Sequence, residues 1–324
     1  DIPPKLDYIF IDECQDFKDS FIELCSMVTS KQVYLAGDIF QSIFAENVTR
    51  DYTADYFLTK CYRTDPKTLM FAHALGLGLF EQTPMRWLSK ENWEACGYTC
   101  EEHPAAQNIV LKRDPVRRFV SIPDDYESVI IKQYRMDNFY EEVNSCIRDI
   151  LQNNPTCTLE DICIILMDNN QNTYAMANTL EYTIGQEFSW QVNKAYETKK
   201  SKPDTVLVSN RNNVKGLEYP FVICLTKGIT DNYVYRNALY TMLTRSFLQT
   251  IFLVQEGDNG ITNGILNGYR EIMREQKMTI QIPSDEDIER IDTRFNEAKR
   301  RRPLKEIIRE AIRELGVDDV QEKK

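Results

Sequence analysis

Two apolar runs near the start of the chain each end in acidic residues. The first run, residues 8–11, is followed by Asp12 and Glu13, and the second, residues 32–36, leads to Asp38. Unbroken apolar runs of this length predict buried strands of a parallel sheet. Parallel strands end at a common edge, so these carboxylates are expected together where an α/β protein binds its ligand. Two core strands followed by solvated acidic turns are the alternative for either run alone.

Further along the chain, short apolar runs alternate with amphipathic stretches, which predicts a parallel sheet covered by helices on both faces. The sequence Asp65-Pro66 is typical of a helix start. Residues 81–125 look irregular. The expected helices cover residues 17–28, 65–79, 138–153, 173–184 and 235–247, and the expected strands cover residues 128–133, 161–167, 205–208, 221–226 and 250–254.

The chain after residue 258 turns polar and is expected to be mainly helical. Residues 304–315 place apolar side chains on one helical face, with Pro303 near the start and Gly316 after the end. The basic run 299–302 precedes them. We expect a helix that docks on the second unit of the chain. A helix that binds a protein partner, with a basic entry that contacts phosphate, is the alternative.

Composition narrows the class of protein. The chain has 324 residues, 42% hydrophobic and 27% charged, which indicates a globular protein of two domains. It has no apolar stretch long enough to span a bilayer and no signal-peptide pattern, so a cytoplasmic location without membrane partners is expected. The net charge of −11 means that nucleic-acid binding would need a local basic groove.

The nine cysteines lie mostly in or beside apolar segments, as expected of small core residues in a reducing compartment. Cys96, Cys100 and His103 form a C-x3-C-x2-H cluster without a fourth ligand nearby. This spacing is thin evidence for zinc, and a zinc-dependent nuclease is the weakest of the functional hypotheses.

Five segments together resemble the UvrD/Rep-like superfamily 1 DNA helicases, and they occur in that family's order. The segments are IDECQD at residues 11–16, GDIFQSIF at 37–44, LTKCYRT at 58–64, VKGLEY at 214–219 and ALYTMLTRS at 238–246. The resemblance implies an α/β fold of RecA-like parallel sheets with flanking helices. An incomplete first RecA-like unit would occupy residues 1–103, a complete second one residues 104–258, and a helical tail residues 259–324.

The same resemblance implies ATP and Mg²⁺ as cofactors. The implied roles are Mg²⁺ binding by Asp12, water activation by Glu13, γ-phosphate contact by Gln41, Arg63 and Arg245, adenine stacking by Tyr62, nucleotide contact by Gly216, and ribose binding by Glu218. Arginine suits the equatorial oxygens of a phosphoryl group in transfer. Cations on both sides of a cleft make hydrolysis depend on closure of that cleft.

The chain departs from the family at two places. No Gly is followed by Lys, so the loop Gly-x-x-x-x-Gly-Lys-Ser/Thr is absent from this sequence, and these residues alone are not expected to turn over ATP. The chain is a fragment, or another polypeptide supplies the loop, or hydrolysis has been lost. Glu46, Asn47 and Asn212 replace usual contacts to single-stranded DNA. The residues assigned to nucleotide binding therefore match the family, whereas those assigned to single-stranded DNA do not.

Two main hypotheses remain. The first is part of an ATP-dependent 3′-to-5′ translocase that acts on single-stranded or partly duplex DNA, with RNA left open as the track. The second is a non-catalytic interaction module derived from such a helicase, with a protein partner held by the C-terminal helix.

Overall fold

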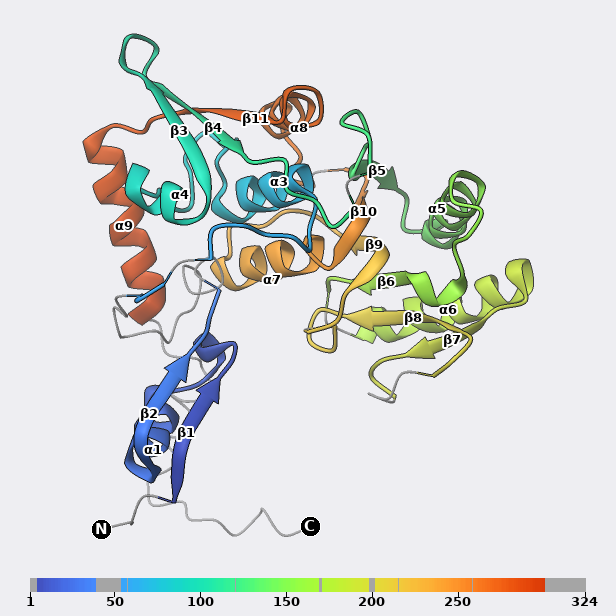
Figure 1. The fold of residues 1–324 in the computed structure, drawn as a ribbon. Helices are drawn as coiled ribbons and strands as arrows, with labels where there is room; N and C mark the ends of the chain where they lie inside the picture. The colour runs from blue at the N-terminus through green and yellow to red at the C-terminus, as the bar shows by residue number, and fades with distance from the viewer. Residues whose placement is uncertain are drawn as a thin grey trace, which may run out of the picture.

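The computed structural model describes residues 5–38, 54–56, 58–119, 121–168, 171–197, 202–214, 216–257 and 259–300. Figure 1 shows a small N-terminal unit, residues 5–38, joined to a larger main body, residues 58–300. The expectations placed on Gln41, Glu46, Asn47 and residues 304–315 lie outside the described residues.

The main body is built around a six-stranded sheet in the order β5-β10-β9-β6-β8-β7, and all neighbouring strands in it are parallel. Its strands are β5 (Val129–Tyr134), β6 (Ile162–Leu166), β7 (Gln191–Lys194), β8 (Thr205–Asn210), β9 (Tyr219–Thr226) and β10 (Ser246–Gln255). The predicted α/β class with a parallel sheet is therefore confirmed. The short polar edge strand β7 was not predicted, because its sequence lacks an apolar run.

Helices cover both faces of this sheet (Figure 1). Alternate residues of β6 enter two cores, with Ile164 in one and Cys163 and Ile165 in the other. Packing on one face comes from α5 (Phe139–Asn153) and α6 (Gln171–Phe188), and on the other from α3 (Pro66–Leu77) and α7 (Tyr233–Leu243). A strand with two covered faces needs apolar residues at every position, which explains the unbroken run in the sequence.

Helix α3 is buried along its whole length. It begins where the sequence predicts, because the Asp65 side chain accepts a hydrogen bond from the Lys67 amide and Pro66 occupies the first turn. The predicted helix over residues 235–247 is too long. Helix α7 ends at Leu243 and β10 already begins at Ser246, since the Thr244 amide bonds back to the Tyr240 carbonyl and closes the last turn.

A second, antiparallel sheet of order β11-β4-β3 corrects the prediction that residues 81–125 are irregular. This region contains α4 (Lys90–Ala95), β3 (Tyr98–His103), the short helix η2 (Pro104–Ala106) and β4 (Asn108–Arg113). The later segment adds α8 (Asn263–Glu275), β11 (Lys277–Gln281) and α9 (Asp285–Arg300), so the described part of the tail is helical apart from one strand. The short helix η3 (Leu159–Asp161) precedes β6.

The core that contains α3 also contains side chains of β3, β4 and the six-stranded sheet. The expected boundary between residues 103 and 104 falls in the exposed turn between β3 and β4, two strands that both contribute side chains to this core. The N-terminal unit and the main body have separate cores, and the domain bounds 1–103, 104–258 and 259–324 stay a prediction.

The N-terminal unit consists of β1 (Leu6–Ile11), η1 (Cys14–Asp16), α1 (Asp19–Val28) and β2 (Thr29–Leu35), with β1 and β2 parallel. Its buried core is only Ile11, Ile22 and Cys25. The prediction that β1 is a buried strand is wrong for this structure, because Phe10 is 77% exposed and Tyr8 is half exposed. A two-stranded sheet with one described helix leaves the other face of the sheet to solvent.

Candidate functional site

The carboxyl ends of β1 and β2 are tied together, as expected of neighbouring parallel strands. The Ala36 amide donates to the Ile11 carbonyl over 2.8 Å, and the Cys14 amide donates to the Ala36 carbonyl over 2.9 Å. Three carboxylates follow these strand ends, those of Asp12, Glu13 and Asp38. We call them the acidic edge.

Gln15 connects the two halves of the acidic edge. Its side-chain nitrogen donates to Glu13 Oε2 over 2.5 Å, and its oxygen accepts from the Asp38 amide over 3.3 Å. A Cβ atom at Gly37 would lie 2.8 Å from Gln15 Oε1 and 2.9 Å from Cys14 Sγ. Glycine at this position therefore permits the close approach that Gln15 needs.

Arg63 and Arg245 come from segments about 180 residues apart, and a hydrogen bond between their neighbours joins these segments. Thr64 Oγ1 donates to the Thr244 carbonyl over 3.2 Å, and both threonines are buried. Arg63 itself is exposed, whereas Arg245 is only 3% exposed. The pair that the resemblance assigns to one phosphate is thus brought together by the fold of the main body.

Arg245 is a buried cation held by backbone carbonyls. Its Nε donates to the Thr241 carbonyl over 2.9 Å and its Nη1 to the Leu217 carbonyl over 3.3 Å. Burial, reinforced by the positive charge of Arg63, lowers the pKa of Arg245, while Glu13 and Asp38 act in the opposite direction. Within the described residues no carboxylate forms an ion pair with Arg245. A desolvated cation beside a second cation favours an anionic ligand.

The segment with Gly216 and Glu218 lies next to Arg245, because the Tyr219 amide donates to the Arg245 carbonyl over 2.9 Å. Gly216 has φ +82°, in the left-handed region that favours glycine. The Glu218 carboxylate is paired with Arg118 at 2.8 Å. The Arg118 guanidinium also lies 4.3 Å from the centre of the Phe247 ring. Arg118 is a neighbour of the site that no motif marks.

The loop that carries Arg118 is anchored at the start of α3. Arg117 forms a buried ion pair with Asp65 at 2.9 Å and a second pair with Asp124 at 2.8 Å. The buried Lys67 ammonium donates to the Asp124 carbonyl over 2.9 Å. Because Asp65 follows Arg63 by two residues, this network holds the Arg63 segment and the Arg118 loop in one frame.

Tyr240 on α7 connects the main body to the acidic edge. Its hydroxyl donates to Asp38 Oδ2 over 3.1 Å, although the side chain is only 5% exposed. The ring stacks on His73 with a centroid distance of 5.2 Å, and His73 Nδ1 lies 2.5 Å from the Tyr98 hydroxyl. The sequence offered only one signal for this contact, the position of Tyr240 within the segment 238–246.

Burial of His73 predicts an acid-sensitive fold. Complete burial, with a smaller contribution from the charge of Arg113, holds the pKa of His73 well below its usual value. The unfolded chain therefore takes up a proton near pH 6.5 that the folded chain refuses, and the free energy of unfolding falls as pH drops below that value, by about 1.4 kcal/mol per unit. Urea denaturation at pH 7 and pH 5 should show a smaller loss in His73→Gln than in the parent. Equal losses in the two proteins would contradict the assignment.

A zinc site at Cys96, Cys100 and His103 has no support in the structure. Cys96 is buried at the end of α4, where burial raises its pKa to about 12, and burial raises the pKa of Cys100 to about 11. Residues 100 and 103 belong to one strand and are separated by an odd number, so their side chains leave opposite faces. Among the described residues no group of three metal-binding side chains was found.

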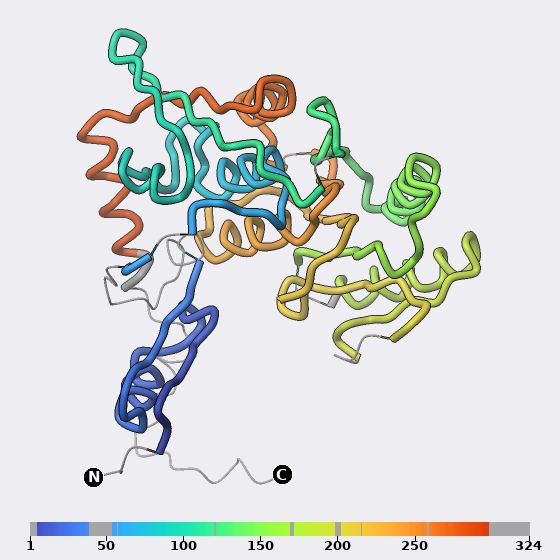
Figure 2. The backbone as a smooth tube through the Cα atoms, in the orientation of Figure 1, coloured from blue at the N-terminus to red at the C-terminus, as the bar shows by residue number. Residues whose placement is uncertain are grey.

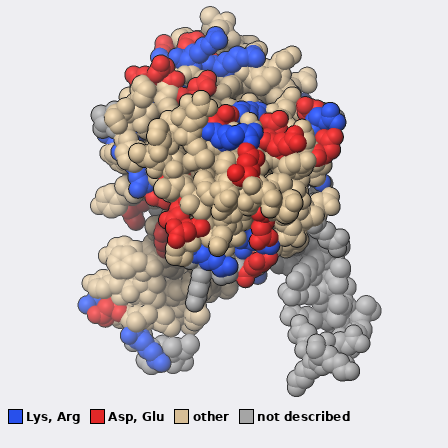
Figure 3. Space-filling view, turned by 90° about the vertical axis from the view of Figure 1, so that its right-hand side faces the viewer, with Lys and Arg blue, Asp and Glu red and all other residues tan. Residues whose placement is uncertain are grey.

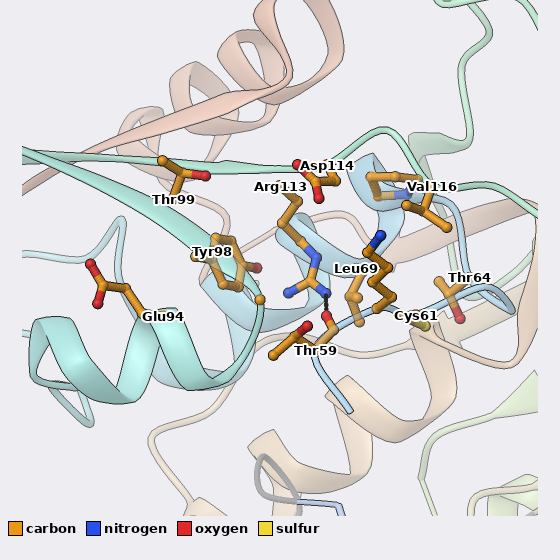
Figure 4. Close-up of a pocket in the computed structure, with 13 residues that line it drawn as sticks. Thr59, Cys61, Thr64, Leu69, Glu94, Tyr98, Thr99, Arg113, Asp114 and Val116 are labelled. Atoms are coloured by element: carbon orange, nitrogen blue, oxygen red, sulfur yellow. Dashed lines mark hydrogen bonds between the residues drawn. The ribbon is translucent and has the colours of Figure 1, made fainter. Parts of the chain in front are cut away.

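A cavity of about 200 Å³ lies beside the candidate site without including it (Figure 4). It is lined by Thr59, Cys61, Tyr98 and Arg113 among others, but not by the acidic edge, Arg63 or Arg245. The Arg113 guanidinium donates to the Thr59 carbonyl over 3.1 Å, the bond that is dashed in Figure 4. This cation therefore supports the chain just before Tyr62. The Tyr62 ring itself is 60% exposed.

On the face shown in Figure 3, basic and acidic side chains of the described residues are interspersed and form no continuous basic tract.

The backbone trace in Figure 2 shows the N-terminal unit extending from the end of the main body where α7 and α9 lie. Across the described ranges, no helix combines the length and apolarity needed to cross a bilayer.

The fold is α/β, and it places Asp38 of the N-terminal unit near the buried Arg245 of the main body. Residues 205–253 match the family described as UvrD-like helicase C-terminal domain, and the chain thus has a UvrD-like helicase C-terminal portion. No curated protein matches the chain.

Two solved structures were also matched to this chain. One is the C-terminal domain of a possible DNA helicase from Lactobacillus plantarum, with 17% identity, a TM-score of 0.31, and coverage of 43% of this chain and 78% of that one. The other is the helicase Lhr of Mycobacterium smegmatis bound to ssDNA and AMP-PNP, with 10% identity, a TM-score of 0.31, and coverage of 92% of this chain and 42% of that one.

Proposed function

We propose that this chain is part of an ATP-dependent DNA translocase of the UvrD-like kind. The observation that carries the proposal is the buried Arg245, which lacks a carboxylate ion-pair partner among the described residues and lies beside Arg63, near enough to the acidic edge for Glu13 and Asp38 to affect its pKa. Cations and carboxylates close to each other between two units are the groups that bind a nucleoside triphosphate and its divalent cation. The family match to residues 205–253 supports the same class.

The donor set fits both cofactors. Asp12 is an exposed carboxylate at a strand end, of the kind that Mg²⁺ prefers, and Arg63 and Arg245 match an anionic phosphate. ATP would supply the phosphoryl group and Mg²⁺ would neutralise its charge. In this proposal Tyr62 and Glu218 hold the base and the ribose, and Gly216 gives the backbone its turn beside them.

The residues of the chain then divide the work. Glu13 would accept the proton of the attacking water, and its bond to Gln15 holds the carboxylate in place. Arg245, fixed by the carbonyls of Thr241 and Leu217, would stabilise charge that develops on the transferred group. Glu13 and Arg245 belong to different units, so hydrolysis would require the two units to close. Repeated closure could drive movement along a nucleic-acid strand.

The proposal also includes the nucleic acid on which the protein moves and the direction of movement. Single-stranded or partly duplex DNA is the proposed partner, with movement 3′ to 5′, and RNA is the alternative track. Asn212 is exposed at the carboxyl end of β8, so it is available for such a contact, although it lacks the ring of the usual histidine.

The test compares the chain alone with the chain supplied with a Gly-Lys-Thr/Ser phosphate-binding loop, fused before it or added as a second polypeptide. The chain alone is expected to show no measurable ATP turnover, and the supplied protein a turnover that single-stranded DNA stimulates. Glu13→Gln should abolish turnover while ATP stays bound, and the exposed control Glu289→Gln should change neither. An ATPase that ignores both DNA and RNA would favour a non-catalytic interaction module instead.

A further inference from the structure

The hydrogen bond between Tyr240 and Asp38 joins two parts of the molecule that otherwise have separate cores. Asp38 follows β2 in the N-terminal unit, and Tyr240 belongs to the main body, 202 residues later. The bond is made by a buried hydroxyl, where water competes little for either partner. A contact of this kind fixes where the acidic edge lies relative to α7.

The main body holds the Tyr240 ring rigidly. The ring stacks on His73 at an interplanar angle of 24°, and His73 belongs to the fully buried helix α3. Tyr98 of β3 contacts His73 in turn. Burial and the neighbouring Asp38 raise the pKa of Tyr240 well above its ordinary value, so the phenol stays protonated and acts as the donor at neutral pH.

Arg245 lies two residues after the end of α7, and hydrogen bonds tie it to the last turn of that helix. Thr244 bonds to the Tyr240 carbonyl through both its amide, at 3.2 Å, and its hydroxyl, at 3.0 Å. Arg245 Nε bonds to the carbonyl of Thr241, the residue after Tyr240. These bonds connect the backbone around Tyr240 directly to the Arg245 guanidinium.

We propose that Tyr240 is a positioning residue that couples the acidic edge to Arg245. Its hydroxyl holds Asp38 so that the acidic edge and Arg245 keep a fixed spacing. The mechanical coupling stands on the contacts above, whereas its consequence for catalysis rests on the proposed function.

The first test needs no nucleotide. Tyr240→Phe keeps the ring and its stacking on His73 and removes one hydroxyl. A hydrogen bond to a charged group changes an opening equilibrium by roughly ten- to a hundredfold, so amide exchange of β1, α1 and β2 should accelerate by about that factor while β6 and β9 are unchanged. Tyr269→Phe is the matched control, because its hydroxyl donates to the Val129 carbonyl over 3.0 Å entirely within the main body.

A double-mutant cycle makes the test specific to the pair. Asp38→Ala should accelerate exchange in the N-terminal unit by a similar factor, and adding Tyr240→Phe to it should accelerate exchange no further. The proposal would be overturned if the accelerations of the two single variants multiplied in the double variant. It would also be overturned if the N-terminal unit of Tyr240→Phe exchanged its amides at the parent rate.

The second test separates this inference from the proposed function. In protein supplied with the phosphate-binding loop, Tyr240→Phe should lower kcat for ATP about tenfold or more with KM little changed. Tyr269→Phe should leave both kcat and KM at the parent values. Coupled exchange without ATPase activity in any form of the protein would leave the coupling standing and remove the proposed function. Normal kcat in Tyr240→Phe would overturn the catalytic part of the inference.

Discussion

Replacing Arg245 by alanine is expected to lower kcat for ATP by about 10³–10⁵ in protein supplied with a phosphate-binding loop, while nucleotide affinity changes little. The physical reason is that a guanidinium aimed at the transferred group stabilises charge that exists only in the transition state. Arg245 is prepared for this role, because its bonds to two carbonyls fix it and burial strengthens its field. Single-turnover kinetics and equilibrium binding of ATP separate the two quantities.

Two further variants frame that experiment. Arg63→Ala should behave similarly, since both cations address one group and neither replaces the other. Arg135→Ala is the control, because Arg135 pairs with Asp137 on the surface and both side chains are largely exposed. A rise in the dissociation constant with an unchanged kcat would mean that Arg245 binds the ground state and is no arginine finger.

Arg236→Ala is expected to reduce the free energy of unfolding by about 3–5 kcal/mol, the cost of breaking a buried ion pair. Arg236 is 1% exposed and pairs with Glu81 at 2.6 Å. It also donates to the carbonyls of Leu75 and Thr230, each over 2.7 Å, so it ties α3 to the residues before α7. Without the guanidinium, the partly buried Glu81 carboxylate loses this cation, and the carbonyls of Leu75 and Thr230 each lose one hydrogen bond.

Urea denaturation followed by circular dichroism measures this change. Arg290→Ala provides the matched control, because Arg290 pairs with Asp287 one turn away on the surface of α9 and should contribute less than about 1 kcal/mol. A midpoint for Arg236→Ala within error of the control would show that solvent reaches the Glu81 carboxylate and replaces the lost partner.

The parts of the fold that could be predicted from the sequence carry their signals locally. The unbroken apolar run of β6 reflects two covered faces, and Asp65-Pro66 marks the start of α3 through its own backbone contacts. Strand β3 was missed because Glu101, Glu102 and His103 interrupt its alternation. Its sheet is completed by β11, more than 160 residues later, which no local pattern reveals.

The candidate site divides in the same way. The motifs supplied Glu13, Arg63, Glu218 and Arg245, and the structure brings their segments together, whereas the roles assigned to them stay predictions. Arg118 could not be found from the sequence, because its partner Glu218 is 100 residues away and depends on the loop anchored by Arg117. A contact between distant residues leaves no periodicity and no spacing.

The N-terminal unit has a practical consequence for work on the isolated chain. Phe10 and Tyr34 stack on one face of the two-stranded sheet, and Phe17, just before α1, stacks on Phe21 of α1; each of these four residues is at least two-fifths exposed. Exposed edge strands and exposed aromatic side chains promote self-association of a protein. Preparations should therefore be kept dilute or in mild detergent, and an apparent oligomer at high concentration should first be attributed to this sticky surface before any biological assembly is inferred from it.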